Sequence, residues 1–336
     1  MRDRDIIEIN NDLTRIFLNL QAYSVLSMQV SLSYWIGFHI LIFLMLALDL
    51  GVFNKKAHKI LMKEAVIWTS VWIALALLFN LFILLKWDDT KALEFLTGYV
   101  IEKSLSVDNI FVFILIFSYF NVKDEYQHRI LFWGIVGALV MRAVFIFTGV
   151  ALIHRFEWII IVFGVFLIYT GIRMALHKHV RVDPANNPLV KLVRKYFPVT
   201  GDDGGGSFFV RINHRIYATP MFLVLLVIES SDLIFAVDSI PAILAITQDT
   251  FIVYTSNIFA ILGLRALYFV VAGMMNRFRY LKVGLSLILT YVGLKMLASF
   301  FGFHIPVFLS LLIIVFILTV FIAASLIIKE KKSSFP

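Results

Sequence analysis

Long runs of apolar residues recur along the whole chain, and shorter polar segments separate them. Nine runs stand out, at roughly 32–50, 65–86, 98–120, 129–150, 156–176, 220–243, 250–274, 280–299 and 305–328. An apolar run of about eighteen residues or more is long enough to cross the hydrocarbon core of a bilayer as an α-helix. The pattern therefore predicts an all-α polytopic membrane protein, with nine transmembrane helices in contact with the lipid bilayer.

The polar segments divide the chain. Residues 1–31 have mixed charge and no secretory signal. Residues 177–219 contain three prolines and the run GDDGGGS, which favour a flexible connector. At the end of this connector, apolar and polar residues alternate in FFVRINHRIYATP, which predicts a short hairpin that turns near Asn213. The predicted parts are a polar segment (1–31), the first two spans (32–97), a three-helix unit (98–176), a cytoplasmic connector (177–219), a second three-helix unit (220–299), and the ninth span with a basic tail (300–336).

Composition supports the membrane class. Hydrophobic residues make up 61% of the chain and charged residues 15%, whereas about 25% of a soluble domain is charged. The mean hydropathy is +0.91. The sequence contains no cysteine, which excludes disulfides and thiolate metal sites within it.

The net charge of +8 indicates orientation in the membrane and not a nucleic-acid partner. If the N-terminus lies outside, the segments predicted inside contain 19 lysines and arginines and the outside segments contain 6. Positive residues concentrate on the cytoplasmic side of membrane proteins. We therefore expect the inner (plasma) membrane, with the N-terminus outside and the C-terminus in the cytoplasm.

The two three-helix units resemble each other. SVDNIF (106–111) matches SSDLIF (230–235), ALVMRAVF (138–145) matches AILGLRALYF (260–269), and LIYTGIRM (167–174) matches LTYVGLKM (289–296). Because each unit has an odd number of helices, the second must enter the membrane from the opposite side. This predicts a 3+3 inverted-topology repeat, an arrangement common in transporters with a central binding site.

Five acidic residues fall inside predicted spans: Glu102, Asp108, Glu229, Asp232 and Asp238. One carboxylate at a helix centre costs about 2.5–3.5 kcal/mol on insertion scales, so these acids should face the protein interior. Because Asp108 and Asp232 are counterparts in the inverted repeat, they should share one depth. Glu102 and Asp238 should both lie about 9 Å further out, and Glu229 about 4.5 Å further in.

Arg142 and Arg265 lie within spans and could balance part of this charge. One interpretation is that they do nothing more than neutralise Asp108 and Asp232. However, two arginines and Lys103 do not balance five ionised acids. The surplus carboxylates must therefore be protonated, bound to metal, or both.

Carboxylate oxygens, with the neutral oxygen of Asn109 beside them, suit Mg²⁺, Ca²⁺ or Mn²⁺. Carboxylates in a low-dielectric site also favour their protonated form, so exchange of metal for protons is a natural hypothesis. Pro241 predicts a helix break soon after Asp238. Broken helices often line cation sites in transporters.

Asp49 ends the first predicted span, before a basic loop. It is either an ion-vestibule residue or a partner of Lys55. The sequence contains no P-loop, GxSxG or HExxH motif, so we expect neither an enzyme nor ATP-coupled transport.

Three stretches carry a family resemblance: VIEKSLSVDNIFVF, ESSDLIFAVDSIPAI and TSNIFAILGLRALYF. They resemble the signatures of the TerC/Alx family of integral membrane proteins, and the likeness runs from about Trp35 to Ile328. The resemblance implies manganese export and metal homeostasis, an older link to tellurite resistance, and kinship with the LysE-type exporter superfamily. The family's acidic motif falls on Glu102, Asp108, Glu229, Asp232 and Asp238.

The expected function is therefore export of a divalent metal, most simply Mn²⁺, with exchange for protons as the hypothesis for its coupling. Glu102, Asp108, Asn109, Glu229, Asp232 and Asp238 are the predicted metal-handling residues, and Arg142 and Arg265 balance their charge. No permanently bound cofactor is expected, since Mn²⁺ is the substrate. Two alternatives stay open: a non-transporting membrane subunit in the metal or tellurite stress response, and a Ca²⁺ or Mg²⁺ carrier.

Overall fold

The computed structural model describes residues 30–51, 60–156, 158–176, 187–201, 204–274 and 280–327. The chain forms two compact units, Met1–Lys55 and Lys56–Pro336. The first unit contains the apolar helix α2 (Leu32–Gly51). The side chain of Asp49 and nearly all of the predicted N-terminal segment lie outside the described residues, as does the basic tail.

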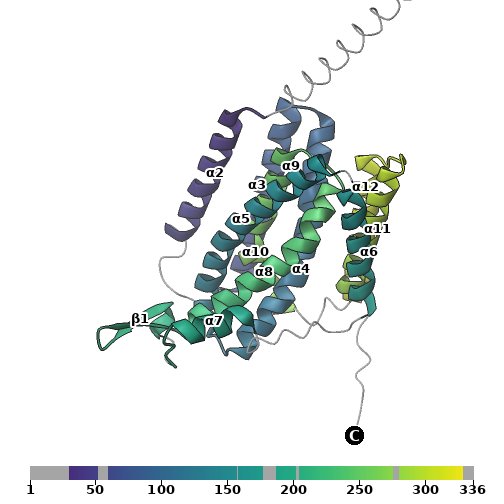
Figure 1. The fold of residues 1–336 in the computed structure, drawn as a ribbon. Coiled ribbons are helices and arrows are strands. Elements are labelled where there is room, and N and C mark those ends of the chain that lie inside the picture. Colours follow the sequence, from purple (N-terminus) through teal and green to yellow (C-terminus); the bar gives the residue numbers. More distant parts are fainter. Residues whose placement is uncertain are drawn as a thin grey trace, which may run out of the picture. The chain divides into compact units, whose positions relative to one another are not determined.

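The second unit consists mainly of long helices (Figure 1). They are α3 (Met62–Lys86), α4 (Asp89–Tyr119), α5 (Asp124–Arg155), α6 (Ile159–Leu176), α8 (Pro220–Leu244), α9 (Thr250–Leu262), α10 (Leu264–Met274), α11 (Leu281–Phe300) and α12 (Val307–Ile327). The connector between α6 and α8 contains a short helix, α7 (Pro188–Tyr196), a 3-10 turn, η2 (Gly204–Gly206), and two strands, β1 (Phe209–Ile212) and β2 (Arg215–Ala218).

Six described helices are long and apolar enough to cross a membrane, and the bent pair α9–α10 makes up to seven spans. The prediction of a multi-span helical protein is thus confirmed, but the count of nine is not. The two remaining predicted spans correspond to α2 and α4. In α4, every stretch of eighteen residues contains at least three charged residues, because Glu102, Lys103 and Asp108 lie near its middle.

The predicted helix break at Pro241 is wrong, because α8 continues through this residue to Leu244. A proline removes only one backbone donor, and the Pro241 carbonyl still accepts a hydrogen bond from the Ala245 N–H at 3.0 Å. The chain bends elsewhere, by 49° between α9 and α10. Gly263 lies at this bend, two residues before Arg265.

The predicted hairpin is confirmed. Strands β1 and β2 pair antiparallel, with Ile212 opposite Arg215. The two turn residues, Asn213 and His214, have φ values of 48° and 66°, as a tight two-residue hairpin requires. Helix α7 was not predicted, although Pro188 at its first position is compatible with a helix start. Val190 of α7 is buried in the core beneath α8.

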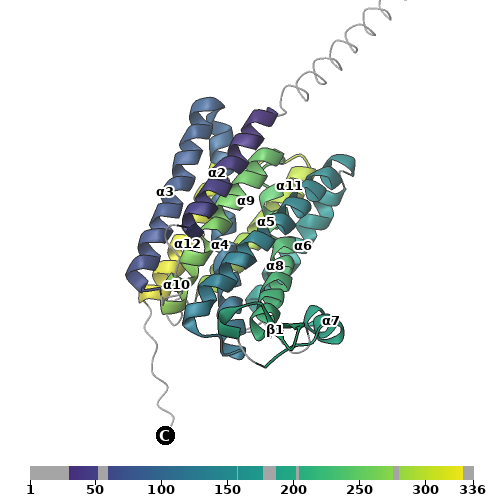
Figure 2. The same cartoon turned by 90° about the vertical axis from the view of Figure 1, so that its left-hand side faces the viewer.

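Helix α4 packs against α8 and α9, α5 packs against α8 and α9, and α6 packs against α11. Figures 1 and 2 show α6 and α11 side by side. Their backbones approach closely, since a Cβ atom on Gly293 would lie 2.7 Å from the Gly164 carbonyl oxygen. Small residues commonly permit such close approach between membrane helices. This contact fixes α6 beside the acidic interior of α4 and α8.

Candidate functional site

Arg142 of α5 is the centre of a buried ion cluster. Its side chain is only 1% exposed, and its guanidinium donates to Asp232 of α8 through Nε at 3.3 Å and Nη2 at 3.2 Å. Nη1 donates to the Glu102 carboxylate of α4. Charge-assisted pairs of this kind are the strongest hydrogen bonds in proteins.

Two neutral side chains complete this cluster. Arg142 Nη1 also lies 3.3 Å from Ser239 Oγ and 3.3 Å from Asn257 Oδ1. The Asn257 amide in turn donates to Glu102 Oε2 at 3.0 Å. The cluster therefore links α4, α5, α8 and α9. We call it the Arg142 cluster, consisting of Arg142, Glu102, Asp232, Ser239 and Asn257.

A second pair of acids lines a cavity between α4, α6, α8 and α11. Asp108 and Asn109 come from α4, Asp238 and Ser239 from α8, and Met174 from α6. Three apolar side chains, Leu105, Phe235 and Leu289, complete the lining. The Thr170 hydroxyl donates to Asp238 Oδ1 at 3.3 Å. We call this space the acid cavity. It adjoins the Arg142 cluster, because Ser239 belongs to both.

The helical repeat explains how the acids divide into these groups. On both α4 and α8 the two central acids are six residues apart, which is about 240° around a helix axis. Each helix can therefore turn one acid toward α5 and α9 and the other toward α6. The depths expected from the repeat and the helical rise pair Asp108 with Asp232 and Glu102 with Asp238. The structure instead joins Glu102 with Asp232 through Arg142, and places Asp108 with Asp238 in the acid cavity. The direction in which each acid points depends on its position around the helix axis, which an estimate of depth alone does not include.

Glu229 belongs to neither group. It lies one turn before Asp232 on α8, half-buried, with its carboxylate against Gly137 of α5. A Cβ atom at position 137 would overlap that carboxylate. Gly137 thus provides the space for Glu229, a role that the sequence alone did not indicate.

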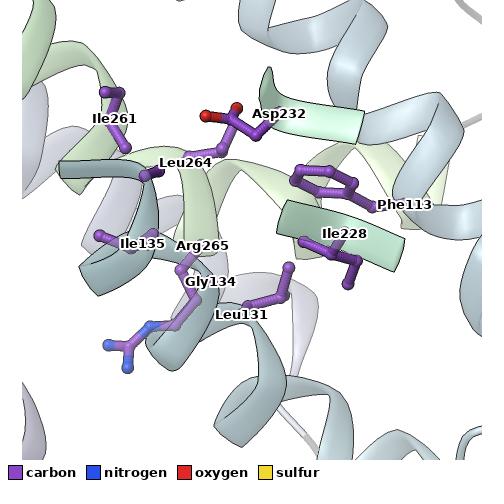
Figure 3. Close-up of a pocket in the computed structure, with 10 residues that line it drawn as sticks. Phe113, Leu131, Gly134, Ile135, Ile228, Asp232, Ile261, Leu264 and Arg265 are labelled. Atoms are coloured by element: carbon purple, nitrogen blue, oxygen red, sulfur yellow. The ribbon is translucent and has the colours of Figure 1, made fainter. Parts of the chain in front are cut away.

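Arg265 lies just after the bend between α9 and α10 and lines another cavity, together with Asp232 and apolar residues of α4, α5, α8 and α9. Figure 3 shows its guanidinium on the side away from the Asp232 carboxylate. The sequence suggested that the two arginines could neutralise Asp108 and Asp232. The hydrogen bonds show that Arg142 pairs with Asp232, which lies in the other predicted repeat.

Sequence reasoning missed a polar network at the beginning of α4 and α9. Lys91 Nζ lies 2.5 Å from Asp249 Oδ2 and 3.7 Å from Glu94 Oε2. Glu94 accepts a hydrogen bond from the Thr247 hydroxyl at 2.8 Å, and Asp249 caps α9 through the backbone N–H groups of residues 251 and 252. The network ties the start of α4 to the segment between α8 and α9.

Among the described residues, no group of three or more His, Cys, Asp or Glu side chains is close enough to hold a metal ion. Four of the five acids stand in pairs, one pair bound to Arg142 and the other lining the acid cavity, and Glu229 lies apart from both. Besides its two acids, the acid cavity is lined by Asn109 and Ser239, whose side chains carry neutral oxygens.

Known relatives cover most of the chain. STKORF319, a membrane protein of Myxococcus xanthus, is 50% identical over 293 residues, which cover 87% of this chain and 92% of that protein. Alx of Escherichia coli (strain K12), named as a candidate membrane-bound redox modulator, is 49% identical over 286 residues, 82% of this chain and 89% of Alx. A Rickettsia bellii membrane protein is 43% identical over 296 residues, 88% of this chain and 98% of its own length.

No solved structure matches the chain. The family described as integral membrane protein TerC matches residues 87–333, which include the Arg142 cluster, the acid cavity and Glu229. This match extends over well more than half of the 336 residues. The chain therefore belongs to the integral membrane protein TerC family.

Proposed function

We propose that this protein exports a divalent metal, Mn²⁺, across the inner membrane in exchange for protons. The observation that carries the proposal is the acid cavity, in which Asp108 and Asp238 face one space beside the Arg142 cluster. Carboxylates inside a membrane bundle are costly and usually mark an ion or proton pathway. Two of them in one cavity are suited to a divalent cation.

The ligand chemistry supports a hard or borderline cation. Two carboxylates, the Asn109 amide oxygen and the Ser239 hydroxyl are oxygen donors of the type that Mg²⁺, Ca²⁺ and Mn²⁺ accept. A carboxylate must lose its proton before it binds a metal. Protons released by Asp108 and Asp238 would therefore leave as the cation enters, which couples the two fluxes.

In this proposal the Arg142 cluster holds the interior together while the acid cavity is empty. Arg142 supplies one positive charge to Glu102 and Asp232, and Ser239 is shared with the acid cavity. A cation bound beside Ser239 would compete electrostatically with the guanidinium. Movement of Arg142 away from Asp232 would then accompany transport, toward Glu229, which lies one turn earlier on α8.

The proposal includes the 3+3 inverted repeat, the orientation with both connector and C-terminus in the cytoplasm, and kinship with LysE-type exporters. Packing of the predicted counterparts supports it: α4 contacts α8, α5 contacts α9 and α10, and α6 contacts α11. In inverted-repeat transporters, the substrate site lies between the two repeats. The acid cavity has residues from both.

The test is Mn²⁺ flux in proteoliposomes that contain the purified wild type or Asp232→Asn. Asparagine keeps the size of the side chain and removes its charge. Glu102 still neutralises Arg142 in this variant, so the buried cation keeps a partner and the protein should fold. We expect the wild type to transport Mn²⁺ and Asp232→Asn to lose most of the flux. Asp89→Asn, an exposed acid at the start of α4, is the matched control and should transport normally. Flux that is absent in the wild type, or unchanged in Asp232→Asn, would contradict the proposal.

Two other functions lead to different results in the same experiment. A Ca²⁺ or Mg²⁺ carrier would move those ions in preference to Mn²⁺. A non-transporting subunit of a stress response would move none of them, and the name given to Alx, a redox modulator, favours this candidate. Since this sequence contains no cysteine, such a subunit would act without a thiol of its own.

A further inference from the structure

The acid cavity contains a sulfur-bearing side chain that the proposed function has not used. Met174 of α6 lines this cavity together with Asp108, Asn109 and Asp238. Thr170, four residues earlier, lies on the same face of α6 and donates a hydrogen bond to Asp238 at 3.3 Å. That bond holds the face of α6 that bears Met174 against the acids.

Asn109 adds a neutral oxygen donor to the cavity. The residue is only 3% exposed and lines the cavity beside Asp108 and Asp238. Amide oxygens are ligands that divalent cations accept together with carboxylates. A cation between Asp108 and Asp238 would therefore have the Asn109 amide oxygen within the same cavity.

The thioether changes which cations such a site prefers. Mg²⁺ and Ca²⁺ are hard ions that take oxygen ligands almost exclusively. Sulfur donors favour softer transition-metal ions. A site with carboxylates alone would therefore admit Mg²⁺, whereas the same site with a thioether favours a softer divalent metal.

We propose that Met174 is a specificity-determining residue, whose thioether in the acid cavity selects divalent transition metals over Mg²⁺ and Ca²⁺. The inference rests on the proposed function and deepens it, because the acids alone do not distinguish Mn²⁺ from the abundant hard cations. The ordinary role of a buried methionine is to fill space. Replacement by leucine, which keeps the volume and removes the sulfur, separates the two roles.

The chain also supplies a matched control. Met296 ends LTYVGLKM as Met174 ends LIYTGIRM, so it occupies the corresponding position of the second predicted repeat. Its side chain is 2% exposed, and it lines neither of the two cavities described above. Met296→Leu therefore makes the same chemical change in a packed position outside the acid cavity.

The experiment records Mn²⁺ entry into proteoliposomes that contain the full chain, alone and with excess Mg²⁺, Ca²⁺ or Cd²⁺. The wild type should be inhibited strongly by Cd²⁺, a soft probe, and weakly by the two hard ions. In Met174→Leu we expect severalfold stronger inhibition by Mg²⁺ and Ca²⁺ and severalfold weaker inhibition by Cd²⁺. Met174→Gln, which substitutes an oxygen ligand, should shift in the same direction, and Met296→Leu should behave as the wild type.

Failures of the two proposals are distinguishable. If the wild type does not move Mn²⁺, the proposed function is overturned and this inference with it. If the wild type moves Mn²⁺ and both Met174 variants retain its pattern of inhibition, only the role of Met174 is overturned. An equal shift in Met296→Leu would also overturn it, because the effect would then arise from packing. If Met174→Leu fails to fold, Met174→Gln provides the same comparison.

Discussion

Arg142 is a fully buried cation that donates hydrogen bonds to three neighbouring helices. A buried charge is tolerated only when it is paired and hydrogen-bonded. Its two carboxylate partners depend on it in the same way, since removing one member of a buried ion pair leaves the other uncompensated. The stability of the bundle interior should therefore be sensitive to this one side chain.

We expect Arg142→Met to lower the free energy of unfolding by about 3–5 kcal/mol, because Glu102 and Asp232 stay buried without their cation. Thermal or denaturant unfolding of the purified protein in detergent measures this loss. Arg155→Met, at the exposed end of the same helix, should have little effect. Adding Glu102→Gln and Asp232→Asn to Arg142→Met should recover part of the loss. Equal effects of Arg142→Met and Arg155→Met would contradict the structural role of the cluster.

Residue types in the sequence were enough to identify the acids and both arginines, but not their partners. Asp232 is bound by Arg142 of the other predicted repeat because rotation about the axes of α4 and α8 sets which side chains meet. Met174 and Gly137 carried no signal of their own. A methionine or a glycine in an apolar helix becomes informative only when the side chain facing it is known.

Among the elements, α6 and α11 approach each other closely. A Cβ atom on Gly171 would lie 2.7 Å from the Ser286 carbonyl oxygen of α11, and one on Gly293 would lie 2.7 Å from that of Gly164. Helix α6 brings Thr170 and Met174 to the acid cavity. The distance between α6 and α11 therefore controls one wall of the acid cavity.

Gly293→Leu should force α6 and α11 apart. Overpacking of this kind costs about 1–3 kcal/mol, and the displaced Thr170 and Met174 should reduce Mn²⁺ flux even in protein that remains folded. Flux and thermal stability are measured on the same preparation. Leu294→Val, at an adjacent position that is 54% exposed, is the control. If Gly293→Leu folds and transports like the control, the acid cavity does not depend on this helix contact.

Element positions were largely predictable because apolar run length sets the helices, and the hairpin turn at Asn213 has a clear sequence signature. Breaks were less predictable. Pro241 is accommodated within α8, whereas the bend between α9 and α10 falls at Gly263. A glycine allows a helix to bend but does not require it, so the sequence does not identify this position. The charge of α4 also prevents a simple hydropathy criterion from recognising it as a span.

At the scale of the second unit, the acids, arginines and small residues form one connected interior. The Arg142 cluster joins α4, α5, α8 and α9, and the acid cavity adjoins it on the side of α6 and α11. A purely structural set of ion pairs would need neither a cavity lined by two further acids nor a buried amide facing it. We therefore propose Asp108 and Asp238 as the residues that exchange protons for the exported metal.

The most direct test records Mn²⁺ entry and proton exit at the same time, in proteoliposomes that carry a metal-sensitive dye and a pH-sensitive dye. The wild type should show both signals with a fixed ratio. Asp238→Asn should show neither while it remains folded, because the acid cavity loses one of its two carboxylates. Mn²⁺ entry without proton movement in the wild type, or unchanged Mn²⁺ entry in Asp238→Asn, would contradict the account.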